Sequence, residues 1–499
     1  MTNDNSLLQQ MQQPDFYPHS VKEPIEVVQT HASYVVLTGD FAYKIKKSVD
    51  FVFFDYSTLE KRRHFCQEEL RMNRPLAPEI YLEVLPIARS QQQYILNGEG
   101  EPVEYTLKMR QFPQEMLWSH LFDQNKLTFE LMEALGRTVA EFHQQAQTND
   151  YIRSFGEPAK IREAFDENYR QSRKYIGRGQ TQRQFDETKQ FSDRFLQQER
   201  DLLQQRQERG WIREGHGDLH LKNICLWDGK VRLFDRIEFN EEFRFVDVMY
   251  DIGFAVMDLE ARGRVDLAHA FLNTYIEQTG DWEGLQVLPL YLSRQAYVRA
   301  KVTSFLLDDA AVSQEEKEKA KETAANYYRL AWEYTQRQNG RIIVMSGLSG
   351  SGKTTVARQV AREVGAIHIR SDAVRKHLAG VELNERGSDE LYSPQMSEKT
   401  YNRLLELGKL LVRRGWTTIL DGKYDRVALR QPIIAWCEAQ GVPLEILHCH
   451  APTEVLRDRL SARVGDISDA TPELLERQLA TAEPFEEGER AYVKEIDTM

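Results

Sequence analysis

The sequence has few cysteines and no long apolar run, and these absences limit the kinds of protein it can encode. Only four of its 499 residues are cysteines, and they are scattered, without the C-x-x-C spacing of a zinc or redox site. We therefore expect ordinary buried thiols. No apolar stretch approaches the ~20 residues that span a bilayer, and residues 1–15 are polar and rich in glutamine. We expect a cytoplasmic protein with no membrane partner.

A positive charge excess is also missing. Residues 341–499 hold 22 Lys and Arg against 24 Asp and Glu, and residues 1–340 hold 43 against 53. Large nucleic-acid-binding surfaces are basic. Charge therefore argues against a nucleic-acid partner, although a short local groove stays open. With 41% hydrophobic and 10% aromatic residues, a chain of this length can build two or three cores.

A complete phosphate-binding motif is present in the last third of the chain. An apolar run at 342–345 precedes Gly-Leu-Ser-Gly-Ser-Gly-Lys-Thr-Thr at 347–355, and an amphipathic segment follows. This order predicts a strand, a phosphate loop and a helix. Backbone N–H groups would surround a triphosphate, Lys353 would reach its β/γ oxygens, and Thr354 would bind Mg²⁺. The predicted nucleotide-binding residues of the loop are Gly347, Ser349, Gly350, Ser351, Gly352, Lys353, Thr354 and Thr355.

Two predicted strands beyond this motif end in an acid. We interpret 366–372 as a strand ending at Asp372, and 417–421 as a strand ending at Asp421, which suits a water-mediated Mg²⁺ contact. Asp372 can orient a substrate hydroxyl while Arg375, one turn later, holds an anionic group. The alternative is an N-cap aspartate with a solvated arginine. A helix expected at 455–463 carries three arginines that we expect to close over the transferring phosphate, Arg457, Arg459 and Arg463.

The N-terminal part begins with a predicted hairpin over 33–47 and a predicted helix over 57–73. Lys44 and Lys46 alternate with apolar residues, so both should leave one face of the second strand. The helix carries Glu68 and Glu69. A strand lysine paired with a helix glutamate holds ATP phosphates in kinase-like folds. A solvated surface lysine is the alternative interpretation.

A second motif, His-Gly-Asp-Leu-His-Leu-Lys-Asn, occupies 216–223. A predicted hairpin follows and brings Asp235 back beside this loop, so that the side chains of Asp218, Asn223 and Asp235 should lie close together. Such a group suits a hydroxyl-activating base and two Mg²⁺ ligands. A metal-free loop of polar turn residues is the alternative.

Residues 30 to about 330 resemble the aminoglycoside phosphotransferase family of kinase-like enzymes, whose catalytic loop reads His-Gly-Asp-x-x-x-x-Asn. The resemblance implies that Asp218 is the catalytic base and that Asn223 and Asp235 hold Mg²⁺. It also implies that Lys44 or Lys46 touches ATP phosphate, with Glu69 as support. Asp247 and Asp251 match the acids that brace the family's catalytic loop.

The chain departs from this family at two points. No G-x-G-x-x-G precedes the lysine strand, and Arg236-Ile237-Glu238 follows the metal aspartate, so that Glu238 is expected as an added metal or substrate contact.

Residues 341–499 resemble the P-loop kinases related to gluconate kinase, chloramphenicol phosphotransferase, the zeta-toxin kinases and the 5′-hydroxyl polynucleotide kinases. The residues that carry this resemblance are 347–354, Asp372, Arg375, Asp421, Arg459 and Arg463.

We therefore expect two domains: a tail over 1–29, an α+β protein-kinase-like domain over 30–335, a linker over 336–340, and an α/β P-loop domain with a parallel sheet over 341–499. The predicted activity is bifunctional, ATP- and Mg²⁺-dependent transfer of γ-phosphate to hydroxyl groups of small molecules. Two alternatives stay open, a nucleotide-regulated switch protein with one inactive module and a nucleic-acid 5′-hydroxyl kinase in the C-terminal part. The sequence fixes neither acceptor nor the oligomeric state. The predicted catalytic residues are Asp218, Lys353, Asp372 and Arg375.

Overall fold

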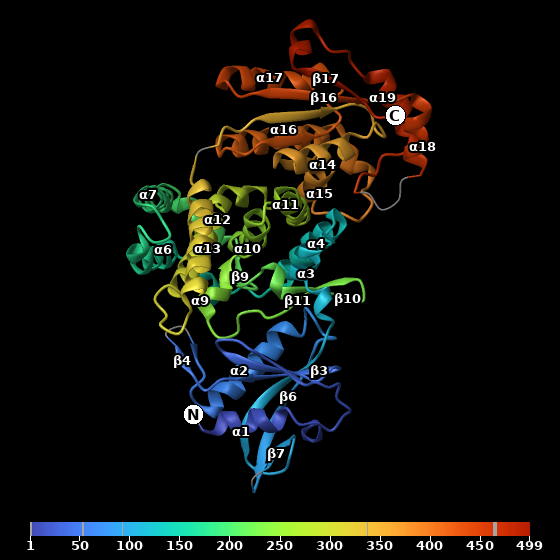
Figure 1. The fold of residues 1–499 in the computed structure, drawn as a ribbon. Coiled ribbons are helices and arrows are strands. Elements are labelled where there is room, and N and C mark those ends of the chain that lie inside the picture. Colours follow the sequence, from blue (N-terminus) through green and yellow to red (C-terminus); the bar gives the residue numbers. More distant parts are fainter. Residues whose placement is uncertain (1, 52–53, 92, 337, 463–466) are drawn as a thin grey trace. The chain divides into compact units, whose positions relative to one another are not determined.

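The computed structural model describes the chain except residues 1, 52–53, 92, 337 and 463–466 (Figure 1). Contacts divide the chain into two units, which are described separately. Unit 1 comprises residues 1–127, 145–161 and 201–255, and unit 2 comprises residues 128–144, 162–200 and 256–499. Because this division runs through the predicted first domain, the predicted boundary at 336–340 stays a prediction.

A six-stranded antiparallel sheet in the order β1-β2-β3-β8-β6-β7 forms the first part of unit 1. The predicted hairpin over 33–47 is confirmed, because β2 and β3 pair with Val35 opposite Lys44. Its turn contains Gly39, whose φ of +97° lies where glycine is favoured. The strands are β1 Glu26–Gln29, β2 Ser33–Leu37, β3 Phe41–Lys46, β6 Tyr81–Ser90, β7 Gln93–Leu96 and β8 Pro102–Arg110.

The segment expected as a tail is structured. It contributes a helix, α1 (Thr2–Met11), as well as strand β1. Leu7 and Met11, four positions apart on α1, are buried with Val36 and Ile45 of the sheet. The prediction of a tail was wrong because it relied on the polar, glutamine-rich composition of this segment, within which Leu7 and Met11 form an apolar helix face.

Helix α2 (Leu59–Asn73) carries Glu69. It begins after Thr58, whose side chain accepts a hydrogen bond from the Lys61 N–H, and not after the expected Ser57 cap.

The motif at 216–223 lies between short strands of unit 1. The turn at Asp228 and Gly229 joins β10 to β11 as predicted, and both residues have positive φ values, of +47° and +72°. The elements around this motif are α8 Arg200–Glu208, β9 Ile212–Glu214, η4 Leu221–Asn223, β10 Ile224–Trp227, β11 Lys230–Leu233, β12 Phe245–Asp247 and α10 Val248–Ala261.

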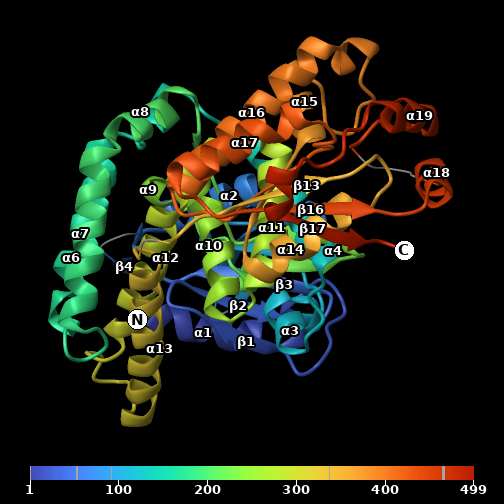
Figure 2. The same ribbon diagram turned by 90° about the horizontal axis from the view of Figure 1, so that it is seen from above.

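Unit 2 contains a helical part and a sheet. Figure 2 shows α12 and α13 side by side with α7 next to them, and contacts join these helices. Among the helices that the structure describes, none is both long and apolar enough to cross a bilayer. The helices that lie wholly or mainly in this part are α4 Phe129–Gln145, α6 Pro158–Ser172, α7 Gln182–Gln198, α11 Val265–Thr279, α12 Leu288–Phe305 and α13 Gln314–Glu333.

The sheet of unit 2 is five-stranded and parallel, in the order β14-β15-β13-β16-β17, which confirms the expected architecture. The sheet differs from the prediction in two ways: one expected strand ends early, and one strand was not predicted. The strand expected at 366–372 ends at Arg370, and Asp372 lies in the first turn of α15. The strands are β13 Ile342–Ser346, β14 Ile367–Arg370, β15 Thr418–Asp421, β16 Leu444–His450 and β17 Val493–Asp497, the last of which was not predicted. The helices are α14 Lys353–Val364, α15 Ser371–Ala379, α16 Pro394–Arg413, α17 Val427–Gln440, α18 Thr453–Ser461 and α19 Pro472–Thr481.

Candidate active sites

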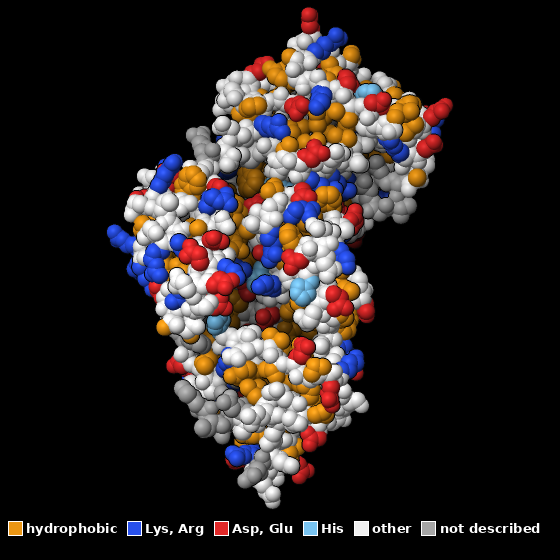
Figure 3. Space-filling model, viewed as in Figure 1, with side chains coloured by type: hydrophobic (Ala, Val, Ile, Leu, Met, Phe, Trp, Pro, Cys, Tyr) orange, Lys and Arg blue, Asp and Glu red, His pale blue; other side chains and the backbone are white. Residues whose placement is uncertain are grey.

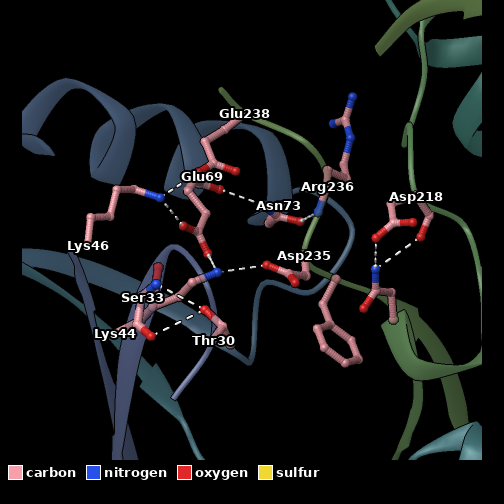
Figure 4. A network of polar contacts seen from close by, with 12 residues as sticks. Thr30, Ser33, Lys44, Lys46, Glu69, Asn73, Asp218, Asp235, Arg236 and Glu238 are labelled. Carbon is pink, nitrogen blue, oxygen red and sulfur yellow. Dashed lines mark hydrogen bonds and ion pairs between the residues drawn. The ribbon is translucent and has the colours of Figure 1, made fainter. Parts of the chain in front are cut away.

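Two lysines and one glutamate form the centre of the first site, in unit 1. Lys44 and Lys46 both reach Glu69 of α2 from strand β3 (Figure 4). Lys44 Nζ lies 2.7 Å from Glu69 Oε1, and Lys46 Nζ lies 2.8 Å from Glu69 Oε2. Glu68 instead pairs with Arg71 at the surface. The structure thus brings the predicted strand lysines together with Glu69.

The two lysines have different surroundings. Lys44 is 14% exposed, and its Nζ also lies 2.7 Å from Asp235 Oδ1, whereas Lys46 is 1% exposed and contacts the Glu238 carboxylate. Tyr56 Oη donates a hydrogen bond of 2.7 Å to the same carboxylate. Lys44 is therefore the lysine beside the predicted metal ligand. Glu238 is buried between Lys46 and Tyr56, which corrects its expected role as a metal or substrate contact.

Mutual attraction keeps this network ionised. Burial opposes the charged form of Lys44, but the carboxylates of Asp235 and Glu69 outweigh it and hold the pKa of Lys44 well above its ordinary value. Burial also opposes ionisation of Glu69, yet the two lysines lower its pKa. Lys44 therefore carries the positive charge that a bound phosphate requires.

The carboxylate of Asp218 is oriented by its own loop. Asn223 Nδ2 donates hydrogen bonds to Asp218 O at 3.0 Å and to Asp218 Oδ2 at 3.1 Å. His220 Nε2 lies 3.3 Å from the same oxygen. The Asp218 side chain stays 35% exposed. A fixed, accessible carboxylate of this kind suits a base that accepts a proton from a bound hydroxyl.

Buried acids support the loop from behind. The N–H groups of His216 and Gly217 donate to the Asp251 carboxylate at 2.7 and 2.8 Å. Gly217 has a φ of +84°, and a Cβ there would lie 2.8 Å from the Phe243 carbonyl oxygen, so glycine is needed. Asp247 forms a buried ion pair of 2.6 Å with Arg206. Asp251 thus braces the loop directly, whereas the contacts of Asp247 fix the neighbouring strand.

Asp235 has an unusual backbone conformation for a residue other than glycine, with a φ of +60°. Its N–H donates to Tyr81 Oη at 3.0 Å, and the next N–H, of Arg236, donates to Asn73 Oδ1 at 2.9 Å. The Arg236 guanidinium also donates to the Met72 carbonyl oxygen at 2.7 Å. Hydrogen bonds on both sides therefore hold Asp235 in a strained conformation that directs its carboxylate to Lys44 (Figure 4).

The side-chain oxygens of this site are of the kind that Mg²⁺ prefers. The Asp235 carboxylate is 46% exposed, and the Asn223 amide, whose nitrogen bonds to Asp218, also carries an oxygen. Hard cations prefer such oxygens, and Mg²⁺ commonly takes its remaining ligands from phosphate and water. Asn223 and Asp235 would hold the ion.

The second site, in unit 2, is built around the phosphate loop between β13 and α14. Its glycines adopt positive φ values of +136° at Gly347, +82° at Gly350 and +79° at Gly352. A Cβ at Gly347 would lie 2.3 Å from the Cys449 carbonyl oxygen. The buried Ser351 hydroxyl lacks a hydrogen-bond partner among the described residues. This cradle, with an unpaired donor inside it, fits a phosphate group.

Lys353 and Thr354 begin the helix after the loop. Lys353 Nζ donates to the Leu348 carbonyl oxygen at 2.7 Å, and burial lowers its pKa. Asp421 Oδ2 accepts a hydrogen bond from Thr354 Oγ1 at 2.8 Å and lies 3.0 Å from His368 Nε2. Burial opposes ionisation of Asp421, but His368 outweighs it and the pKa falls to about 2. A hydroxyl beside an ionised carboxylate fits Mg²⁺ bound to nucleotide phosphate.

Asp372 and Arg375 have different environments. Burial raises the pKa of Asp372, opposed in part by Arg370, which suits a general base. Arg375 is buried, and its Nη1 donates to the Leu391 carbonyl oxygen at 3.1 Å and to Ser397 Oγ at 3.2 Å. The alternative of a solvated arginine is therefore wrong. Part of the guanidinium is already bonded within the fold.

The remaining loop residues are placed as follows. Ser349 is half-buried and Thr355 is exposed. Arg459, expected over the phosphate, donates to the Gly350 carbonyl oxygen at 3.4 Å and to Thr498 Oγ1 at 3.2 Å. It thus joins the loop to the last residues of the chain. Arg463 lies outside the described residues.

Sequence reasoning missed two residues of this site. Gln478 of α19 accepts from the Ser349 N–H at 2.9 Å and donates to Ser349 Oγ at 3.0 Å, and no motif indicates a glutamine 129 positions away. His368 lies two positions before Arg370 on β14, so strand alternation places both on one face. That alternation is a signal that could have identified His368.

Comparisons with known proteins match both parts of the chain. A family model described as "Phosphotransferase enzyme family" matches residues 57–288, and one described as "AAA domain" matches residues 342–485. An uncharacterised protein of Mycobacterium tuberculosis is 31% identical over 480 residues, which cover 95% of this chain and 94% of the relative. A protein named probable gluconokinase, of Xenopus tropicalis, is 29% identical over 169 residues, 31% of this chain and 85% of that protein. A solved choline/ethanolamine kinase family protein from Mesorhizobium loti is 8% identical, covers 67% of this chain and 99% of its own, and has a TM-score of 0.38.

Proposed function

This chain belongs to the same family as the Mycobacterium tuberculosis protein and joins a segment of the phosphotransferase enzyme family to a P-loop kinase segment; from that premise we propose that it is a bifunctional, ATP-dependent kinase. Each segment would transfer the γ-phosphate of ATP to a hydroxyl group of a small molecule. We also propose a cytoplasmic location, as expected from the sequence.

In the first site, Lys44 binds the phosphates and Glu69 holds Lys44 in position from α2. Asp218, oriented by Asn223, positions the acceptor hydroxyl and accepts its proton. Mg²⁺, when bound by Asn223 and Asp235, supplies positive charge that offsets the negative charge of the phosphates.

In the second site, the N–H groups of the phosphate loop and Lys353 bind the phosphates of ATP. Asp421 fixes the hydroxyl of Thr354, and these two residues would hold Mg²⁺. Asp372, whose pKa is raised by burial, accepts the proton of the second acceptor.

One observation carries the proposal of two activities: each unit holds its own lysine, acid and metal-ligand set, with Lys44, Asp218 and Asp235 in unit 1 and Lys353, Asp372 and Asp421 in unit 2. A nucleic-acid acceptor has less support. On the face shown in Figure 3, acidic and basic side chains are interspersed, and neither segment has a basic excess.

The test uses the full chain and two single variants. Asp218→Asn and Lys353→Ala are assayed for transfer of ³²P from ATP to a panel of hydroxyl-bearing metabolites. We expect each variant to lose a different labelled product. If one variant loses every labelled product and the other loses none, the module that carries the substitution without effect is a nucleotide-binding switch and not a kinase.

A further inference from the structure

Helix α11 covers the edge strand of the parallel sheet in unit 2. β14 is the first strand in the order of that sheet, so one of its sides has no neighbouring strand. Asn273 of α11 lies at this side. Its Nδ2 donates to the Ala366 carbonyl oxygen at 2.9 Å, and its Oδ1 accepts from the His368 N–H at 2.9 Å. The amide of Asn273 therefore takes the place of a strand partner.

Glu277 lies one turn further along α11. Its Oε2 is 3.7 Å from Arg370 Nη1, and its carbonyl oxygen lies 2.8 Å from His377 Nε2 of α15. Both side chains of the Arg370–Glu277 pair are largely buried. Asn273 and Glu277, four positions apart on the helix, thus contact His368 and Arg370, two positions apart on the strand.

The same two strand residues also lie beside residues of the phosphate site. The His368 side chain contacts Asp421, which binds Thr354. Arg370 lies directly opposite Asp421 in the strand register and two positions before Asp372 in the first turn of α15. All the residues in this series of contacts, from Asn273 and Glu277 of α11 to Thr354, belong to unit 2.

We propose that Asn273 and Glu277 are positioning residues of the P-loop site, acting through His368 and Arg370 on Asp421 and Asp372. Both belong to the segment matched by the phosphotransferase family, whereas the site belongs to the P-loop segment. The first segment therefore supplies part of the support for the second segment's nucleotide site. This inference rests on the proposed function of that site.

A second contact between the same parts provides a matched control. Glu133 of α4 forms an ion pair of 2.9 Å with Arg362, near the end of α14. This pair also joins the helical part to the P-loop part, but none of its hydrogen bonds or ion pairs among the described residues involves β14 or Asp421.

The experiment measures ADP binding to the full chain by calorimetry, with excess Mg²⁺ and with EDTA. The component of the isotherm that disappears in Lys353→Ala is assigned to the P-loop site. We expect Asn273→Leu to lower the ADP affinity of that component about tenfold in Mg²⁺. Tenfold is the lower end of the loss observed when a group that orients a metal ligand is removed. With EDTA its affinity should stay within about twofold of wild type, because the loop N–H groups and Lys353 do not depend on β14. Glu277→Gln should also weaken ADP binding in Mg²⁺, by a smaller factor. Glu133→Gln should change the ADP affinity neither in Mg²⁺ nor in EDTA.

A double-mutant cycle distinguishes positioning from a general structural role. In a His368→Ala background, Asn273→Leu should have no additional effect on Mg²⁺-dependent binding, because the side chain that connects β14 to Asp421 is gone. If Asn273→Leu does not fold, Asn273→Asp replaces it; this variant keeps the acceptor for the His368 N–H and should give an intermediate effect.

Three results would overturn the inference or its premise, and they differ from one another. Equal weakening with and without Mg²⁺, or additive effects in the cycle, would make the contact merely structural. Wild-type affinity in Asn273→Leu would refute the inference and leave the proposed function intact. An isotherm that Lys353→Ala does not change would refute the proposed function itself.

Discussion

The two lysines expected to bind phosphate are held by different means. Lys44 lies in an ionic network with the carboxylates of Glu69 and Asp235, which come from separate elements of unit 1. Lys353 donates to a carbonyl oxygen of its own loop, Leu348. The pKa of Lys44 lies above its ordinary value, although burial opposes this, whereas burial lowers the pKa of Lys353.

This difference shows two ways of preparing a charge for phosphate. In unit 1 the charge is stabilised in advance by acids, so its position depends on tertiary contacts. In unit 2 the backbone of one short loop positions the charge, and few partners are needed. A substitution in the loop should therefore affect chemistry with little effect on folding, whereas a substitution in the ionic network should affect both.

The largest expected effect tests the loop. Lys353→Ala should lower turnover at the P-loop site about a thousandfold, the upper range for loss of one group that stabilises developing charge. The melting temperature should hardly change, because Lys353 Nζ contacts a carbonyl within its own loop. Steady-state kinetics and circular dichroism check both expectations. Undiminished turnover would refute the assignment of the phosphate loop.

The first site is tested by two substitutions that should differ in kind, one of the base Asp218 and one of Asp235 in the ionic network. Asp218→Asn should lower kcat of the first site, by up to about a thousandfold, because it removes the base. Asp235→Asn should instead raise KM for Mg²⁺-ATP and lower stability, because Asp235 also holds Lys44. Initial rates over a range of ATP and Mg²⁺ concentrations separate the two. Identical profiles would mean that Asp218 and Asp235 do not have distinct roles.

A smaller effect is expected for the acid of the second site. Asp372→Asn should lower phosphate transfer to the acceptor about a hundredfold, the lower range for loss of a general base. ATP affinity should stay unchanged, because the loop and Thr354 bind the nucleotide independently. Calorimetric titration with ATP, alongside the transfer assay, measures both. A parallel loss of binding and transfer would assign Asp372 to support of the loop.

The smallest effect concerns Arg375. Because its guanidinium bonds to the Leu391 carbonyl oxygen and to Ser397, Arg375→Ala should lower the free energy of unfolding by about 1–3 kcal/mol. Denaturant titration of wild type, Arg375→Ala and Arg375→Lys measures this. Full stability combined with a raised KM for an anionic acceptor would instead support the anion-binding role expected from the sequence.

The local motifs and several elements were predictable from the sequence because they depend on residues close together in the chain. The phosphate loop needs glycines and a lysine in nine consecutive positions, and its strand and helix flank it directly. The β2–β3 hairpin and the turn at Asp228 likewise follow from short-range patterns. Strand β17 was missed because Val493–Asp497 alternates too briefly to stand out, and it becomes a strand by pairing with β16.

Partner choice was decided only by the tertiary structure. Both Lys44 and Lys46 fitted the sequence pattern equally, and Lys44 is distinguished by its contact with Asp235, 191 positions away. The sequence likewise gave no sign that Arg375 turns inward or that Asn273 bonds to β14, 95 positions from His368. The physical reason is that backbone conformation responds mainly to neighbouring residues, whereas the partners of a side chain are set by which distant segments the fold packs beside it.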